Sequence, residues 1–201
     1  EESHRIAPIN PYGASKAMVE ELLRTYHRMH GISSYALRYF NAAGADSEGE
    51  IGESHEPETH LVPRAIAASL NSGTIFNVYG GDFATSDGSA VRDFIHVEDL
   101  ARAHILALKA LTDSSTPRAE VVNLGTGEGH SVLEILQRIG ALTGREVRCE
   151  IVDRRQGDPP VLVAEANRAR SELSWAPIRS RIDDILRDAI RWARISSENT
   201  I

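Results

Sequence analysis

The stretch NPYGASK, residues 10–16, has the features of a helix start, and the rest of the sequence can be organised around it. Asn10 belongs to the residue types favoured at the N-cap, and Pro11 suits the first helical position, where a missing N–H costs nothing. Tyr12 and Lys16 then lie one turn apart on the same helix face. The pattern predicts a helix that places a phenol beside an ammonium.

A phenol beside an ammonium suits proton transfer. A tyrosine hydroxyl normally stays protonated at neutral pH, and a nearby cation and the positive end of a helix both favour the phenolate. A bound cationic cofactor could add to this effect. The alternative is a surface tyrosine beside a solvated lysine, as in most isolated Tyr-x-x-x-Lys matches. The position of Tyr12 and Lys16 directly after a helix cap favours the catalytic interpretation.

The composition limits the function classes. The 201 residues are 41% hydrophobic and 25% charged, as is usual for globular proteins. The net charge of −7 argues against a binder of nucleic acids or anionic membranes. No apolar run approaches the ~18 residues of a membrane span. Cys149 is the only cysteine, which excludes an intrachain disulfide and indicates a reducing cytoplasm.

Helical and strand patterns alternate along the chain. We expect helices at 11–30, 61–70, 98–111, 131–144, 167–173 and 181–193, and strands at 33–40, 76–79, 91–97, 120–124 and 147–152. Residues 41–44 are expected to form a loop, and residues 46–58 an acidic, solvated flap. Ser131 and Glu134 fit a capping box. Strands that alternate with helices are typical of an α/β fold with a largely parallel sheet.

Three other patterns could in principle form binding sites. GTGEG, residues 125–129, lacks the G-x-G-x-x-G spacing of a dinucleotide loop, so a tight turn is favoured. The oxygen spacing in the acidic flap does not fit an EF-hand, and His27 and His30 have no third ligand. We therefore expect no metal site.

Six separated phrases, in the same order, resemble the UDP-glucose 4-epimerase family of the extended short-chain dehydrogenase/reductases. They are residues 8–16, 37–44, 58–63, 87–99, 123–127 and 154–158, so the resemblance runs nearly end to end. It implies an α/β fold consisting of the carboxyl-terminal part of a Rossmann-like doubly wound parallel sheet plus a smaller α/β substrate-binding domain.

The resemblance also implies a division of the chain. Residues 1–60 match the remaining part of the NAD-binding Rossmann domain. Residues 61–201 match mostly the UDP-sugar-binding domain, with a strand and a helix near 90–112 returning to the Rossmann sheet. The family's Gly-rich NAD loop and its catalytic Ser/Thr precede the Tyr-Lys helix and are expected to lie outside this sequence. The sequence as given is therefore expected to bind NAD poorly and to be inactive alone.

By the same resemblance, Tyr12 and Lys16 are the catalytic residues of an NAD-dependent isomerase that interconverts UDP-glucose and UDP-galactose. Tyr12 takes the proton of the sugar 4-hydroxyl, Lys16 holds the nicotinamide ribose, and Tyr39 and Phe40 lie beside the nicotinamide. The matching UDP-sugar residues are Asn41 (phosphates), His60 and Leu61 (nucleotide), Asn77, Val78 and Tyr79 (uracil), Arg92 and Arg155 (diphosphate), Asp158 (uridine ribose) and Leu162 (a gate for N-acetylated sugars).

Two other functions remain open from the sequence. One is a related enzyme such as an NDP-sugar 4,6-dehydratase, and the other is a catalytically silent nucleotide-sugar-binding module. The phrases NAAG (41–44) and VRDFIH (91–96) favour the epimerase, and the intact pair Tyr12 and Lys16 argues against a silent module. The preference between hexose and N-acetylhexosamine stays open. The resemblance further implies a homodimer formed through the Tyr-Lys helix.

Overall fold

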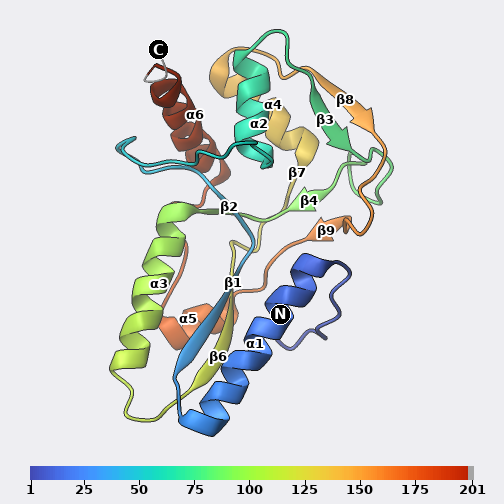
Figure 1. Cartoon of the computed structure of the whole chain (residues 1–201). Coiled ribbons are helices and arrows are strands. Elements are labelled where there is room, and N and C mark those ends of the chain that lie inside the picture. Colours follow the sequence, from blue (N-terminus) through green and yellow to red (C-terminus); the bar gives the residue numbers. More distant parts are fainter. Residues whose placement is uncertain (199–201) are drawn as a thin grey trace.

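The computed structural model describes residues 1–198, and helices and strands alternate along them (Figure 1). The helices are α1 (Pro11–His30), α2 (Leu61–Leu70), α3 (Val97–Thr112), α4 (Val132–Thr143), α5 (Asn167–Leu173) and α6 (Ile182–Glu198). The strands are β1 (Ser34–Tyr39), β2 (Asn41–Ala43), β3 (Phe76–Tyr79), β4 (Val91–Arg92), β5 (Phe94–His96), β6 (Ala119–Leu124), β7 (His130–Ser131), β8 (Cys149–Val152) and β9 (Val161–Leu162). None of the helices within residues 1–198 is long and apolar enough to cross a membrane.

The strands pair mainly in parallel. β1 runs parallel to β6, β2 to β5, and β3 to β8, while β4 pairs in parallel with β9 and antiparallel with β7. Parallel partners require a crossover connection, which helices such as α3 and α4 supply. The predicted α/β class with largely parallel pairing is confirmed.

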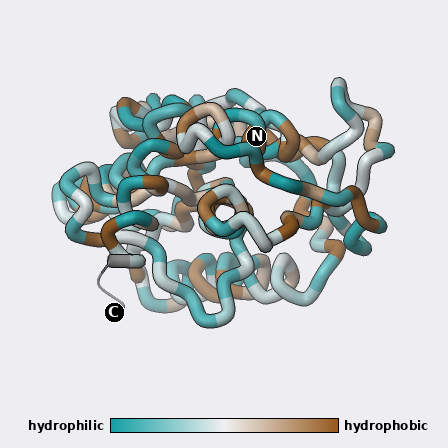
Figure 2. Tube along the Cα trace, turned by 90° about the horizontal axis from the view of Figure 1, so that it is seen from above, coloured by the Kyte–Doolittle hydropathy of each residue, from teal (hydrophilic) through white to brown (hydrophobic). Residues whose placement is uncertain are grey.

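Two hydrophobic cores lie at opposite ends of the molecule. One lies between β6, α3 and α5 and contains Leu124 and the fully buried Trp175. The other lies between α2, α4, α6 and β3 and contains Ile66, Ile139 and Ile185. Hydrophobic and hydrophilic residues alternate along the trace (Figure 2), as expected for helices that bury one face. The chain crosses between the two ends near β2, β4 and β9 (Figure 1).

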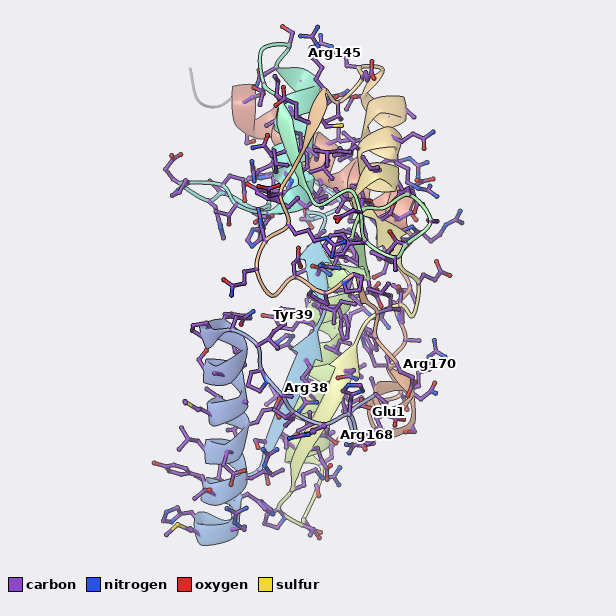
Figure 3. All side chains as sticks on the ribbon, turned by 90° about the vertical axis from the view of Figure 1, so that its right-hand side faces the viewer. Glu1, Arg38, Tyr39, Arg145, Arg168 and Arg170 are labelled. Atoms are coloured by element: carbon purple, nitrogen blue, oxygen red, sulfur yellow. The ribbon has the colours of Figure 1, made fainter. Side chains whose placement is uncertain are left out.

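Helix α1 begins and ends as predicted. The Asn10 side chain accepts a hydrogen bond from the Gly13 amide at 2.8 Å, and Gly31 ends the helix with a φ of 65°. Most of its side chains project away from the rest of the chain (Figure 3). Its buried residue is Glu20, whose carboxylate oxygens accept two hydrogen bonds of 2.6 Å from Arg38 on β1. An ion pair, rather than apolar packing, attaches the middle of this helix to the sheet.

Two local predictions were wrong. Residues 41–44 were expected to form a loop, but Asn41–Ala43 forms β2 and pairs with β5. The strand expected at 91–97 is split into β4 and β5 at the buried Asp93. The Asp93 carboxylate accepts hydrogen bonds from the amides of Thr126 (3.0 Å), Gly127 (3.0 Å) and Ala164 (3.2 Å). The Asp93 backbone meanwhile donates to the Leu162 carbonyl and accepts from the Asn41 amide, so the chain passes at Asp93 from the β4–β9 pairing to the β5–β2 pairing.

The same contacts decide the nature of the GTGEG turn. The Thr126 and Gly127 amides donate to Asp93, so they are not available for a phosphate. The turn leads directly into α4, where Ser131 accepts a 3.0 Å hydrogen bond from the Glu134 amide. The structure thus has a tight turn and the first half of the capping box. The Glu134 carboxylate binds His130 and Arg138 instead of the Ser131 amide.

Candidate active site

A cavity of about 730 Å³ lies at the amino-terminal end of α1 and the carboxyl end of β1. Figure 3 shows Tyr39 at the end of β1, close to the first turn of α1. The sequence-predicted residues that line this cavity are Tyr12, Tyr39, Phe40, Asn41, His60 and Leu61. The chain therefore gathers the proposed base and the two aromatic residues into one space, as expected for residues around a reacting ring.

A second cavity, of about 300 Å³, adjoins the first. Asn41, His60 and Leu61 line both cavities and form their shared wall. The remaining sequence-predicted residues that line the second cavity are Asn77, Tyr79, Arg92, Arg155 and Asp158. The two cavities are therefore neighbours, separated by these residues.

Three cationic side chains line the second cavity, Arg64, Arg92 and Arg155. The Arg155 guanidinium carbon lies 3.8 Å from the centroid of the Tyr79 ring. A hydrogen bond from Arg155, together with its charge, lowers the pKa of the Tyr79 phenol, and Arg64 adds to this shift. Arg92 forms an ion pair with Asp158 and donates a 2.7 Å hydrogen bond to its neighbour's carbonyl at Val91. The cavity thus offers a stacked arginine and a paired arginine, both suited to binding phosphate oxygens.

The Tyr-Lys pair has the predicted arrangement on α1. The Lys16 Nζ lies 5.2 Å from the centroid of the Tyr12 ring. The Tyr12 residue is 72% exposed, and the Ser15 hydroxyl donates a 2.7 Å hydrogen bond to its carbonyl. The helix cap at Asn10 fixes the first turn, so Tyr12 stands at the cavity with Lys16 one turn behind it. Within this chain the pair is open to solvent.

Three predicted site residues lie outside both cavities. Lys16 lines neither of them, and it contacts the site through the Tyr12 ring. The side chain of Val78 is buried in the core beneath β3, so only its backbone can face a ligand. Leu162 lies on β9, paired in register with Arg92, and is partly exposed.

The sequence reasoning missed several cavity residues. Arg64 on α2 lines the second cavity, and Glu53 and His55 line the first. Glu53, His55, Glu58 and His60 also offer ligand atoms that all lie within 4.8 Å of one another. The signal was present in the spacing E-x-H-x-x-E-x-H of residues 53–60. This spacing differs from that of an EF-hand, so the EF-hand pattern does not reveal the group.

Comparison with known proteins places the chain in a family. Residues 1–125 match the NAD dependent epimerase/dehydratase family. The chain belongs to this family. The UDP-glucose 4-epimerase of Rhizobium leguminosarum bv. trifolii is 45% identical over 99% of the chain and 60% of the relative, and that of Rhizobium meliloti (strain 1021) is 49% identical over 88% and 53%. The chain thus spans little more than half the length of these curated relatives.

Solved structures show the family fold. The UDP-glucose 4-epimerase from Brucella ovis in complex with NAD matches 93% of this chain and 57% of that chain, with 47% identity and a TM-score of 0.85. The enzyme from Stenotrophomonas maltophila, with bound NAD and formylated UDP-arabinopyranose, matches 99% and 59%, with 40% identity and a TM-score of 0.90. These similarities confirm the Rossmann-like α/β fold class expected from the sequence.

Proposed function

We propose that the whole protein interconverts UDP-glucose and UDP-galactose by NAD-mediated oxidation and re-reduction at C4 of the sugar. The observation that carries this proposal is the pair of adjoining cavities. One contains Tyr12 and the other contains Arg155 stacked on Tyr79, with Asn41 and His60 between them. This arrangement suits a ligand with a reacting sugar at one end and a nucleotide at the other. Similarity to UDP-glucose 4-epimerases over nearly the whole chain supports the same assignment.

The described residues fit the nicotinamide end of NAD. Tyr39 and Phe40 present aromatic rings to the cavity that contains Tyr12, and Lys16 lies one turn along α1, within reach of a ribose. No G-x-G-x-x-G loop occurs within the sequence, so the pyrophosphate end has no cradle among these residues. The residues here therefore hold the reacting end of the cofactor.

In this mechanism the residues of this chain move one proton between the sugar and Tyr12. NAD, when bound, would provide the group that accepts a hydride from C4 and returns it to the opposite face of the sugar. The Tyr12 oxygen takes the proton of the 4-hydroxyl as C4 is oxidised, and it gives a proton back when the 4-keto sugar is reduced. Lys16 stabilises the tyrosine anion that exists before the proton is taken up and after it is returned. No net oxidation results, because the sugar ends each cycle at its original oxidation state.

The second cavity holds the nucleotide in this proposal. The uracil lies against Asn77, the backbone of Val78 and the Tyr79–Arg155 stack. The diphosphate replaces the Asp158 carboxylate as the partner of Arg92, because a phosphate offers Arg the same bidentate oxygen geometry. Asp158 is then free to accept hydrogen bonds from the ribose hydroxyls. Leu162 beside Arg92 remains the predicted gate for N-acetylated sugars.

Substitution of the tyrosine tests the reaction. In the whole protein, Tyr12→Phe should lower the rate of UDP-galactose formation from UDP-glucose by about 10²- to 10⁴-fold, because it removes one positioned proton-transfer group. UDP affinity, measured by calorimetry, should stay near the wild-type value. Arg155→Ala is the matched variant, and it should weaken UDP binding.

The reaction products distinguish the epimerase from the two other candidate functions. Wild-type activity in Tyr12→Phe would contradict the assigned base. A 4-keto-6-deoxy sugar product would identify a 4,6-dehydratase. UDP binding by the wild-type protein without turnover, in the presence of NAD, would identify a silent module.

The two cavities also support the proposed division of the chain. Tyr12, Tyr39 and Phe40 come from residues 1–60, and the second cavity is lined mostly by residues from 61–201. Ile95 on β5 and Leu100 on α3 pack in the same core as β6, which supports the return of residues 90–112 to the Rossmann sheet. A single cysteine, Cys149, agrees with the predicted cytoplasmic location.

The outer face of α1 supports a homodimer. Met18, Leu22 and Tyr26 form an exposed apolar stripe along this helix. Contiguous exposed apolar side chains are typical of interaction surfaces. Light scattering of the whole protein should give twice the mass of one chain, and the mass of a single chain would contradict the dimer.

A further inference from the structure

The loop between β2 and α2 carries a group of metal-ligating side chains. Glu53, His55, Glu58 and His60 each offer one ligand atom, and all four atoms lie within 4.8 Å of one another. We propose that these four residues bind a zinc ion. Zinc bonds of about 2.0–2.2 Å to nitrogen and oxygen give a tetrahedron with edges of roughly 3.5 Å. The present separations of up to 4.8 Å exceed this edge by about 1 Å, so the side chains would turn inward to hold the ion.

His60 lies at the centre of the group. Its Nδ1 contacts Glu53 Oε1 closely and lies 3.4 Å from Glu58 Oε1. The centroids of the His55 and His60 rings are 4.9 Å apart, with an angle of 57° between the rings. Glu58 Oε1 also accepts 2.7 Å hydrogen bonds from the amides of Thr59 and His60, which fix its position. Both histidines and both carboxylates therefore converge on one point.

The charges of the group favour a cation. The Glu53 and Glu58 carboxylates lie close together, and like charges at such a separation repel. Among residues 1–198, no lysine or arginine forms an ion pair with either carboxylate. A divalent cation between them would remove this repulsion and would also satisfy the two imidazoles.

The ends of the segment are attached to the scaffold. Trp192 on α6 donates a 2.8 Å hydrogen bond to the Glu53 carbonyl, and its ring packs so closely on Gly52 that a Cβ there would lie 2.2 Å away. His60 is the N-cap residue of α2. The four ligands thus lie within eight residues whose ends are positioned by two helices. A short loop of this kind loses little chain entropy when it binds a metal.

The donor set favours a transition metal such as zinc, and the number of ligands indicates its role. Two imidazoles and two carboxylates suit zinc, whereas calcium and magnesium prefer oxygen ligands alone. Four protein ligands leave no open position, which is typical of a structural rather than a catalytic zinc site. Glu53, His55 and His60 also line the cavity that contains Tyr12. The ion would therefore fix the wall of that cavity without taking part in the chemistry.

Metal titration of the whole protein tests the proposal. After treatment with a chelator, calorimetric titration with Zn²⁺ should show one tight site per chain, and Co²⁺ should give the intense visible absorption of a tetrahedral site. His55→Ala and Glu58→Gln should each weaken Zn²⁺ binding by more than about 100-fold, because even outer-shell partners of a metal are worth about 10- to 100-fold. His30→Ala, an exposed histidine on α1, is the matched control and should bind like the wild type.

Three results would overturn the proposal. The first is no Zn²⁺ binding by wild-type protein that circular dichroism shows to be folded. The second is wild-type affinity in both His55→Ala and Glu58→Gln. The third is displacement of Zn²⁺ by Ca²⁺ at equal concentration, which would indicate an oxygen site instead.

Discussion

Helices α1 and α6 have similar apolar stripes but opposite environments. On α6, Ile185 and Leu186 are 0% exposed and pack against α2 and α4. On α1, Met18 is 66% exposed and Leu22 is 57% exposed. The sequence periodicity of the two helices predicts the same thing, an amphipathic helix with one face to bury. The difference shows that a stripe identifies a contact face without saying whether the partner lies in the same chain.

The largest effect on stability is expected when one leucine from each helix is replaced by alanine. Leu186→Ala in the 201-residue chain should lower the free energy of unfolding by about 2–5 kcal/mol, because it leaves a cavity in a closed core. Leu22→Ala should change it by less than about 0.5 kcal/mol, because the side chain is already exposed. Chemical denaturation of both variants measures the difference. Similar losses in the two variants would show that α1 is packed as tightly as α6.

A smaller effect is expected at the ion pair that attaches α1 to the sheet. Glu20 holds Arg38 through two hydrogen bonds, which also raise the pKa of the Arg38 guanidinium. Glu20→Gln should destabilise the chain by about 1–3 kcal/mol, between the values for exposed and buried pairs. Glu21→Gln, which breaks only exposed contacts on the same helix, is the control and should have a much smaller effect than Glu20→Gln.

Amide hydrogen exchange shows which helix loses stability in the Glu20→Gln variant. If α1 is attached mainly through Glu20, its amides should exchange faster in Glu20→Gln while those of α6 stay protected. Unchanged exchange in α1 would contradict an attachment through this pair.

The smallest expected effect is pH-dependent and concerns Arg138, which links α4 to α6. Burial raises the pKa of the Glu134 carboxyl, but hydrogen bonds from His130 and Arg138 outweigh it, so the pKa lies below its usual value. A lowered folded-state pKa contributes stability above the unfolded pKa of about 4.5, and this contribution is lost as the pH falls through the folded value. Arg138→Ala should therefore cost up to about 1 kcal/mol at pH 7, and the cost should shrink as the pH falls below about 4.5.

An exposed pair on α1 is the control for this titration. Arg28 and Glu21 lie exposed on the surface of one helix, so Arg28→Ala should have a much smaller effect than Arg138→Ala at pH 7. Denaturation at several pH values measures both variants. A cost of Arg138→Ala that does not change with pH would show that its packing matters more than its charge.

Local signals predicted much of this structure correctly. The bounds of α1, α2, β3 and α5 follow from caps, glycines and apolar periodicity, all of which act within a few residues. β2 and the break at Asp93 could not be predicted in this way. Both depend on partners far along the chain, namely β5 for Asn41–Ala43, and Thr126 and Ala164 for Asp93.

The sequence by itself determined the helix that carries Tyr12 and Lys16, the alternation of strands and helices, and the motifs that resemble a nucleotide-sugar enzyme. Tertiary structure alone decided which of these residues meet. It joined Tyr12 to Asn41 and His60 in one cavity, stacked Arg155 on Tyr79, and brought Glu53 and His55 to His60. The physical reason is the distance along the chain over which each kind of interaction acts. Caps and periodicity are local properties of the backbone, whereas a site requires side chains from distant segments to be brought together by the packing of the whole chain.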